Sequence, residues 1–159
     1  MEITKAGEES QITNFYKGKN VFITGATGFM GKVLIEKLLR SCKDIGRIYV
    51  MARKKRGKSI EQRIHTIFEN ELFSRVKIEH PTFLDKITAV AGDVGEPALG
   101  LNEKDRERLI NDVDIVFHAA ATVNFDEKIK MSVNINIRGT EEILKLCREM
   151  SHLQVSSQP

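Results

Sequence analysis

The chain has 159 residues, of which 41% are hydrophobic and 30% charged, with a formal net charge of +3 at pH 7. This length is typical of one domain with a sizeable core, and the composition is that of a globular protein without a low-complexity tract. The small net charge gives no indication of a nucleic-acid partner, and no segment approaches the roughly 18 consecutive apolar residues of a membrane span.

The amino-terminal segment, residues 1–14, is polar and mixed in charge, unlike a secretory signal. We expect it to be a disordered lead-in to a single domain over residues 15–159. The two cysteines, Cys42 and Cys147, fit neither a metal spacing nor a disulfide framework. The sequence therefore predicts buried free thiols, no metal site, and a chain that is itself soluble and intracellular.

Short β-branched segments alternate with longer amphipathic ones, which is typical of an α/β fold with a doubly wound, Rossmann-like parallel sheet. Strands are expected at 19–24, 47–53, 86–92, 113–119 and from 153 onward. Helices are expected at 29–40, 59–68, 102 onward and 131–149, with a broken helix at 71–85, where Pro81 interrupts the apolar pattern. We expect the printed sequence to be truncated within the fifth strand, so that the domain is incomplete at its carboxyl end.

Local signals support two of the helix starts and suggest the buried face of the last helix. Ser59 and Gln62 have the spacing of a capping box. Asn102 is a suitable N-cap, and the acidic residues after it suit the positive end of the helix dipole. The residues expected to face the core from 131–149 are Val133, Ile137, Ile143, Leu144 and Cys147.

A glycine-rich turn, Thr24-Gly25-Ala26-Thr27-Gly28-Phe29-Met30-Gly31, joins the first strand to the following helix. Gly25 allows a sharp exit from the strand, Gly28 lets the backbone approach a pyrophosphate, and Gly31 permits close helix packing. Free N–H groups at the helix start favour phosphate binding, whereas the alternative is a turn that is merely rich in glycine. The cofactor-binding residues predicted here are Gly25, Thr27, Gly28, Phe29, Met30 and Gly31.

The end of the second strand indicates which dinucleotide binds. NAD-specific sites place an acidic residue there, but this strand ends at Arg53 and is followed by a basic run to Lys58. A guanidinium can bind a 2′-phosphate through charge-assisted hydrogen bonds, so we predict NADPH as the cofactor. The basic run is also compatible with a nucleic-acid patch, but a solvated loop is the commoner origin, and no nucleic-acid partner is expected.

Two later segments complete the predicted cofactor site. After the third strand, Asp93 is placed to accept from the adenine amino group and Val94 to pack on the ring, although an Asp that only forms a turn fits equally well. After the fourth strand, the small side chains allow close approach of the backbone to the cofactor; they belong to Ala119, Ala120 and Ala121. His118 has no evident partner residue and is interpreted as structural.

Residues 17–42, 117–125 and 136–140 resemble the motifs of alcohol-forming fatty acyl-CoA reductases, which are extended short-chain dehydrogenase/reductases with a male-sterility-type NAD(P)-binding domain. The similarity extends over roughly residues 15–153. It implies that the complete protein reduces a long-chain acyl-CoA to a fatty alcohol, using two NADPH through an aldehyde. The resemblance also implies peroxisomal or endoplasmic-reticulum membrane association of the full protein.

The resemblance further implies a catalytic tyrosine followed four positions later by a lysine. Tyr16 is followed at that spacing by Asn20, and Tyr49 by Arg53, so the dyad is absent and the chain alone is expected to be inactive. Ser157 is the candidate for the family's carbonyl-binding hydroxyl, with the neighbouring Ser156 as an alternative, and a polar tail without a catalytic role fits the segment equally well. Two alternatives remain open: a thioester-reductase domain of a carrier-protein system, and a non-catalytic NADPH-binding module or regulatory short form.

Overall fold

A computed structural model describes residues 10–54, 56–122 and 129–157. They form a five-stranded parallel sheet in the order β3-β2-β1-β4-β5. The strands are β1 (Val21–Thr24), β2 (Ile48–Ala52), β3 (Ile87–Ala91), β4 (Ile115–His118) and β5 (Val155–Ser157). The chain runs outward from β1 to β3 and then returns to the other side of β1, which confirms the doubly wound, Rossmann-like fold.

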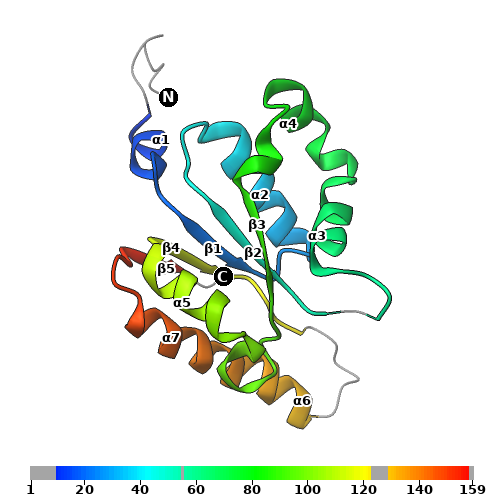
Figure 1. Ribbon diagram of the computed structural model, residues 1–159, viewed down its shortest axis with the longest axis vertical. Helices are drawn as coiled ribbons and strands as arrows, with labels where there is room; N and C mark the ends of the chain where they lie inside the picture. The colour runs from blue at the N-terminus through cyan, green and yellow to red at the C-terminus, as the bar shows by residue number, and fades with distance from the viewer. Residues whose placement is uncertain (1–9, 55, 123–128, 158–159) are drawn as a thin grey trace.

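Helices cover both faces of this sheet (Figure 1). The α-helices are α1 (Gln11–Tyr16), α2 (Phe29–Ser41), α3 (Ile60–Phe68), α4 (Ser74–Glu79), α5 (Glu103–Asp112), α6 (Ile129–Val133) and α7 (Gly139–Glu149). A π-helical turn, Asn134–Arg138, links α6 to α7. The described residues also form 3-10 turns at Glu71–Phe73, Phe83–Lys86 and Pro97–Gly100.

The alternation of side chains along the central strand divides the core into two layers. Val21 and Ile23 belong to the cluster under α2, α3 and α4, whereas Phe22 belongs to the cluster under α5 and α7. All three side chains are fully buried. Burial on both faces explains why β1 and β2 are mostly apolar, without the polar alternation of a half-exposed strand.

Most of the local signals in the sequence are confirmed. Ser59 and Gln62 form the capping box of α3, and Asn102 caps α5 by accepting from the backbone N–H of Asp105. The segment around Pro81 is a broken helix, and both cysteines are buried and free. Of the expected lead-in, residues 1–9 lie outside the described residues, while Gln11 to Asn14 are helical and belong to α1.

The expected inward face of the last helix is wrong at three positions. Ile137 and Leu144 are 63% and 47% exposed, and Val133 is also exposed, whereas Ile143 and Cys147 are buried. Successive helical residues are about 100° apart, so Ile143 and Leu144 cannot both face the sheet. The π-helical turn also shifts the register, and a 3.6-residue period drawn through it misplaces the residues before it.

In the described parts of the chain, no helix combines the length and the apolar character needed to cross a membrane.

Candidate cofactor site

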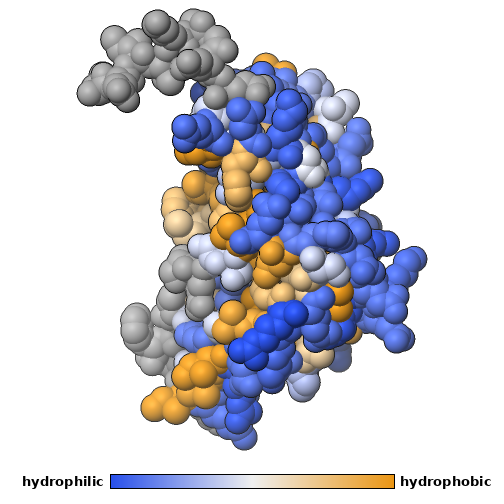
Figure 2. Space-filling model, turned by 90° about the vertical axis from the view of Figure 1, so that its left-hand side faces the viewer, coloured by the Kyte–Doolittle hydropathy of each residue, from blue (hydrophilic) through white to orange (hydrophobic). Residues whose placement is uncertain are grey.

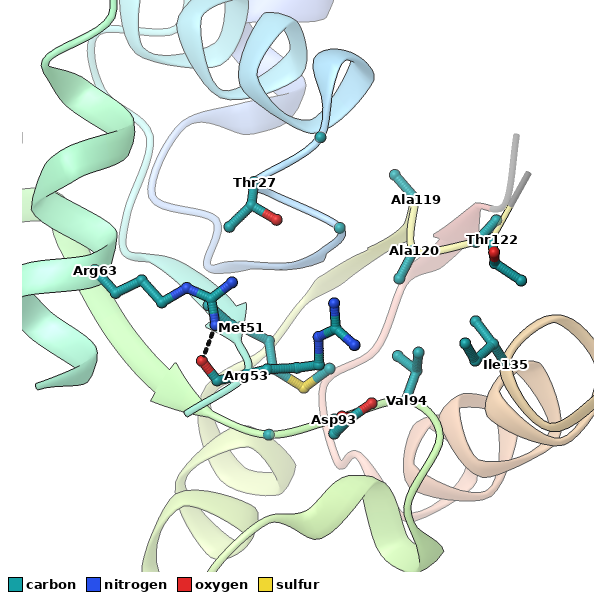
Figure 3. A pocket seen from close by; sticks show the side chains of 15 residues that line it. Thr27, Met51, Arg53, Arg63, Asp93, Val94, Ala119, Ala120, Thr122 and Ile135 are labelled. Atoms are coloured by element: carbon teal, nitrogen blue, oxygen red, sulfur yellow. Dashed lines mark hydrogen bonds between the residues drawn. The ribbon is translucent and has the colours of Figure 1, made fainter. Parts of the chain in front are cut away.

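A cavity of about 380 Å³ lies at the carboxyl ends of the strands, where the strand order reverses beside β1 (Figure 3). Such a switch point is where open α/β sheets bind their ligands. Its walls come from the segments that follow β1, β2, β3 and β4, together with α3 and the π-helical turn. The lining residues are Gly25, Thr27, Gly28, Met51, Ala52, Arg53, Arg63, Gly92, Asp93, Val94, Ala119, Ala120, Ala121, Thr122 and Ile135.

Nine of the twelve predicted cofactor residues line this cavity, and three from the start of α2 do not. Phe29 and Met30 have side chains that are 76% and 60% exposed, and Gly31 is buried against the turn. At Gly31 an added Cβ would lie 2.3 Å from the carbonyl oxygen of Gly25. Gly31 therefore has the expected packing role, while Phe29 and Met30 stand beside the cavity as part of the helix start.

The start of α2 has no side-chain cap. Gly28 is the N-cap residue, no side-chain hydrogen bond closes the helix start, and the first turn contains no acidic residue. The first backbone N–H groups of a helix have no intrahelical acceptor, and the helix dipole gives this end a partial positive charge. With Gly28 lining the cavity, this arrangement favours an anion such as a phosphate.

Gly25 brings the glycine turn against the end of β4. Its φ is +72°, a left-handed conformation that favours glycine, and an added Cβ would lie 2.4 Å from the backbone carbonyl of Ala119. Any larger residue at this position would push the two walls apart. The sequence therefore brings the walls together by having no side chain at their closest approach.

Two arginines meet at the end of β2. Arg53 leaves the strand into the cavity, and Arg63 reaches it from α3, where its Nη1 donates to the carbonyl oxygen of Arg53 (Figure 3). Sequence reasoning found Arg53 from its place after the strand but missed Arg63. The amphipathic pattern places Arg63 on α3 without indicating how far its long side chain reaches.

Further cations surround this end of the cavity. Arg63 also lines a neighbouring cavity of about 300 Å³ together with Lys32 and Lys58, and another of about 590 Å³ with Lys54. The larger of these cavities also contains the carboxylates of Asp93 and Glu96. The positive charge is therefore concentrated on the side of α2 and α3, where it favours an anionic group.

Asp93 and Val94 form the wall after β3. The backbone N–H of Asp93 donates to the carbonyl oxygen of Leu99 at 2.8 Å, and its Oδ1 accepts from the backbone N–H of Gly95 at 2.9 Å. Asp93 thus forms the turn that the sequence left as an alternative, and it also lines the cavity.

The wall after β4 is anchored to β1. The backbone N–H groups of Ala119 and Ala120 donate to the carbonyl oxygen and the hydroxyl of Thr24, each at 3.3 Å. His118 lies behind the wall, 4% exposed, with Nδ1 2.6 Å from the Thr24 hydroxyl. Burial lowers the pKa of His118, which keeps the ring neutral, and His118 does not line the cavity. These contacts are those of a structural histidine.

The tyrosines and Ser157 lie away from the cavity. Tyr49 donates from its hydroxyl to Asp112 at 2.7 Å, and burial, with this hydrogen bond, raises its pKa to about 12. Burial also raises the pKa of Tyr16. Ser157 is exposed on β5, in register with Phe117 of β4. None of the three lines the cavity, so no tyrosine of the chain is placed to protonate a bound substrate.

Among residues 10–54, 56–122 and 129–157, no group of three or more His, Cys, Asp or Glu side chains is arranged to hold a metal ion.

A family described as male sterility protein matches residues 23–158. A fatty acyl-CoA reductase of Drosophila melanogaster, wat, is 45% identical over 152 residues, which is 96% of this chain and 29% of the relative. Human fatty acyl-CoA reductase 1 is 42% identical over 91% of this chain and 28% of its own length. The chain thus spans less than a third of these relatives.

The fold is also similar to a solved reductase structure. The terminal R domain of the myxalamid PKS-NRPS biosynthetic pathway has a TM-score of 0.70 and 32% identity, covering 89% of this chain and 34% of that domain.

Proposed function

The chain belongs to the male sterility protein family, whose match extends over residues 23–158, and from this premise we propose that it is the NADPH-binding part of an alcohol-forming fatty acyl-CoA reductase. The complete enzyme would reduce a long-chain fatty acyl-CoA to a fatty alcohol. Relatives named as fatty acyl-CoA reductases support this activity. The chain spans less than a third of their length, so the activity is proposed for the complete enzyme and not for this chain alone.

One observation carries the assignment of the cofactor. The uncapped start of α2 and the guanidinium of Arg53 line the same cavity. A dinucleotide with an additional phosphate needs both features: helix N–H groups for its pyrophosphate and a cation for its 2′-phosphate. When bound, NADPH supplies the hydride, and the residues of this chain hold and orient it.

The remaining walls fit the other parts of the cofactor. In the proposal, Arg63 assists Arg53 at the 2′-phosphate, and Asp93 and Val94 receive the adenine. The alanines after β4 allow the nicotinamide half to lie close to the backbone. The acyl group and the proton donor would be held by other parts of the enzyme. From this chain, Ser157 is the candidate to donate a hydrogen bond to the substrate carbonyl. By itself the chain would bind NADPH without oxidising it.

Arg53→Ala tests the choice of cofactor. We expect NADPH affinity to fall about 10- to 100-fold, because a charge-assisted contact to the 2′-phosphate is lost, while NADH affinity changes little. Fluorescence titration with both dinucleotides measures the difference. Arg47→Ala is the matched control, because Arg47 precedes β2 at the opposite end of the strand and does not line the cavity. Equal losses for NADPH and NADH in Arg53→Ala would refute the 2′-phosphate role.

The choice between a free acyl-CoA and a carrier-bound thioester as substrate needs a separate experiment. The similar R domain belongs to a PKS-NRPS pathway, which favours the carrier-bound alternative. The higher identity to the fatty acyl-CoA reductases, 45% against 32%, favours a free acyl-CoA. The full-length protein should oxidise NADPH faster with a long-chain acyl-CoA than with the same acyl group on a carrier protein. The opposite preference would support a thioester-reductase domain, and NADPH binding with neither activity would support a non-catalytic module.

A further inference from the structure

The turn Pro97–Gly100, in the loop after β3, is left-handed at three consecutive residues. Ala98, Leu99 and Gly100 have φ values of 49°, 60° and 57°. The left-handed region brings Cβ close to the following carbonyl oxygen, so residues with a side chain rarely adopt it in succession. Such a backbone persists only where surrounding contacts hold it, and strained segments of this kind are concentrated at functional sites. The turn therefore depends on the contacts around it.

The left-handed turn brings Leu99 back against the start of its own loop. The carbonyl oxygen of Leu99 accepts from the backbone N–H of Asp93 at 2.8 Å, and its side chain is buried in the core cluster under α5 and α7. An added Cβ at Gly92 would lie 2.8 Å from the same carbonyl oxygen, so the contact leaves no spare room. The position of Asp93 is thus coupled to the conformation of the turn.

Asp93 has one carboxylate oxygen available to a ligand. Its Oδ1 accepts from the backbone N–H of Gly95 at 2.9 Å, and within the described parts of the chain no hydrogen bond reaches its Oδ2. The side chain lines the cavity beside Val94 (Figure 3). In the proposed function this carboxylate accepts from the amino group of adenine. Such a hydrogen bond needs donor and acceptor about 3 Å apart and well aligned, so Asp93 must be held in place.

The contact that holds the turn from outside its loop comes from α7. Glu142 accepts from the backbone N–H of Ala98 at 2.7 Å through Oε2 and from Lys145 at 2.8 Å through Oε1. Among the described residues, no other side chain from outside the loop hydrogen-bonds this turn. The hydrogen bond from Lys145, followed by that from Ala98, lowers the pKa of Glu142. The acceptor is therefore ionised at neutral pH, and its bond to the backbone N–H is charge-assisted.

The same face of α7 packs on the other end of the loop. An added Cβ at Gly139, one helical turn before Glu142, would lie 2.8 Å from the carbonyl oxygen of Val94. The helix thus meets the loop both next to Asp93 and at the left-handed turn.

We propose that Glu142 is a positioning residue for adenine recognition. It holds the left-handed turn, and the turn fixes the Asp93 carboxylate where the adenine amino group can donate to it. The inference rests on the proposed function, since it places the adenine in this cavity. Glu142 does not line the cavity, so it acts on the ligand only through the turn. Arg53 follows β2 and has no hydrogen bond to this turn, so the selectivity for NADPH over NADH does not depend on Glu142.

The test separates adenine recognition from dinucleotide binding in general. The probes are NADPH and its analogue with hypoxanthine in place of adenine, which has no amino group to donate to Asp93. The variants of the full chain are Glu142→Ala and Glu142→Gln, of which the second keeps an oxygen acceptor. Glu141→Ala is the matched control, because Glu141 pairs with the same Lys145 at 2.9 Å and makes no hydrogen bond to the turn. Alanine raises helix propensity at both positions, and thermal unfolding reports the integrity of each variant.

The unmodified chain should bind NADPH about tenfold more tightly than the hypoxanthine analogue. In Glu142→Ala this preference should fall to about twofold through weaker NADPH binding, while the preference for NADPH over NADH remains. Glu142→Gln should retain most of the preference for adenine, and Glu141→Ala should not change it.

An unchanged preference for adenine in Glu142→Ala would overturn the positioning role, and so would a parallel loss of affinity for both probes. Equal binding of NADPH and the analogue by the unmodified chain would also refute it, because Asp93 would then not recognise the amino group. Binding of neither probe refutes the proposed function itself, and the inference with it.

Discussion

Helices α2 and α5 begin in opposite ways, although each follows a strand or turn of the same sheet. At α5 the side chain of Asn102 accepts from the backbone N–H of Asp105 at 2.8 Å, and two acidic residues lie in the first turn. At α2 the N-cap is Gly28, with no side-chain hydrogen bond and no acidic residue in the first turn. The protein closes one helix start with its own side chains and leaves the other to face a cavity.

This difference separates stability from binding. A capped start satisfies backbone N–H groups within the chain and contributes to the free energy of unfolding. An uncapped start beside a cavity leaves those groups to a ligand, and the absence of acidic residues avoids repulsion of a phosphate. Substitutions at the start of α5 should therefore change stability alone, whereas substitutions at α2 should change binding, with or without stability.

The largest effect is expected for Gly31→Ala, which should affect both properties. The added Cβ would lie 2.3 Å and 2.6 Å from backbone atoms of Gly25 and Ala26, which are not free to move aside. We expect a loss of about 3 kcal/mol in the free energy of unfolding, together with loss of NADPH binding. Urea denaturation and NADPH titration measure the two, with exposed Lys37→Ala on the same helix as control. Normal stability in Gly31→Ala would contradict the tight packing.

Gly28→Asp should abolish the difference between the helix starts by giving α2 its own cap. Gly28 has φ −78° and ψ 173°, values that suit an N-cap aspartate, and the nearest atom to an added Cβ is the Gly25 carbonyl oxygen at 3.2 Å. The carboxylate should occupy the N–H groups and repel the cofactor. We expect a roughly hundredfold loss of NADPH affinity, with stability within about 1 kcal/mol of the unmodified chain.

The result for Gly28→Asp has a direct control in Gly28→Ala, which adds the Cβ without a charge or a cap. Its loss of affinity should be smaller. Retention of full NADPH affinity by Gly28→Asp would show that the start of α2 does not hold the phosphates.

Asn102→Ala should do the reverse at α5. It removes the cap, and the free energy of unfolding should fall by about 1 kcal/mol. Because Asn102 does not line the cavity, the affinity for NADPH should not change. The two measurements are thermal unfolding and NADPH titration on the same sample. A change in affinity comparable to that of Gly28→Asp would remove the distinction between the two helix starts.

A smaller effect, on the pH dependence of stability, is expected from His118 at the end of β4. Burial lowers the pKa of His118 from its ordinary 6.5. Below that value the unfolded chain takes up a proton that the folded chain resists, so this group should lower stability as pH falls from 6.5 towards the lower pKa of the folded chain. Denaturation midpoints at pH 7.5 and 5.5 should differ less in His118→Gln than in the unmodified chain. An identical pH dependence in both would contradict the neutral, buried histidine.

Local patterns in the sequence were sufficient for the fold and for part of the site. The glycine spacing of the β1–α2 turn, the capping box at Ser59 and the position of Arg53 depend on neighbours along the chain. Parallel strands place their carboxyl ends on one edge of the sheet, so residues that follow different strands can be predicted from the sequence to lie in one site. Asp93 and Ala119 were found in this way.

The residues that sequence reasoning missed depend on contacts between elements. Arg63 and Ile135 come from helices, and their part in the cavity follows from the reach of a side chain and from the π-helical turn. Met51 and Thr122 lie beside predicted residues, but the backbone path that turns them to the cavity is set by tertiary packing. Phe29 and Met30 were predicted from the motif, although helix geometry points their side chains outward.

Equilibrium titration of the unmodified chain with NADPH and with NADH tests the central claim most directly. The uncapped start of α2 predicts saturable binding of both dinucleotides, and Arg53 with Arg63 predicts that NADPH binds at least about tenfold more tightly. Equal affinities would contradict the role of the two arginines. Failure of either dinucleotide to saturate the chain would contradict the cofactor site as a whole.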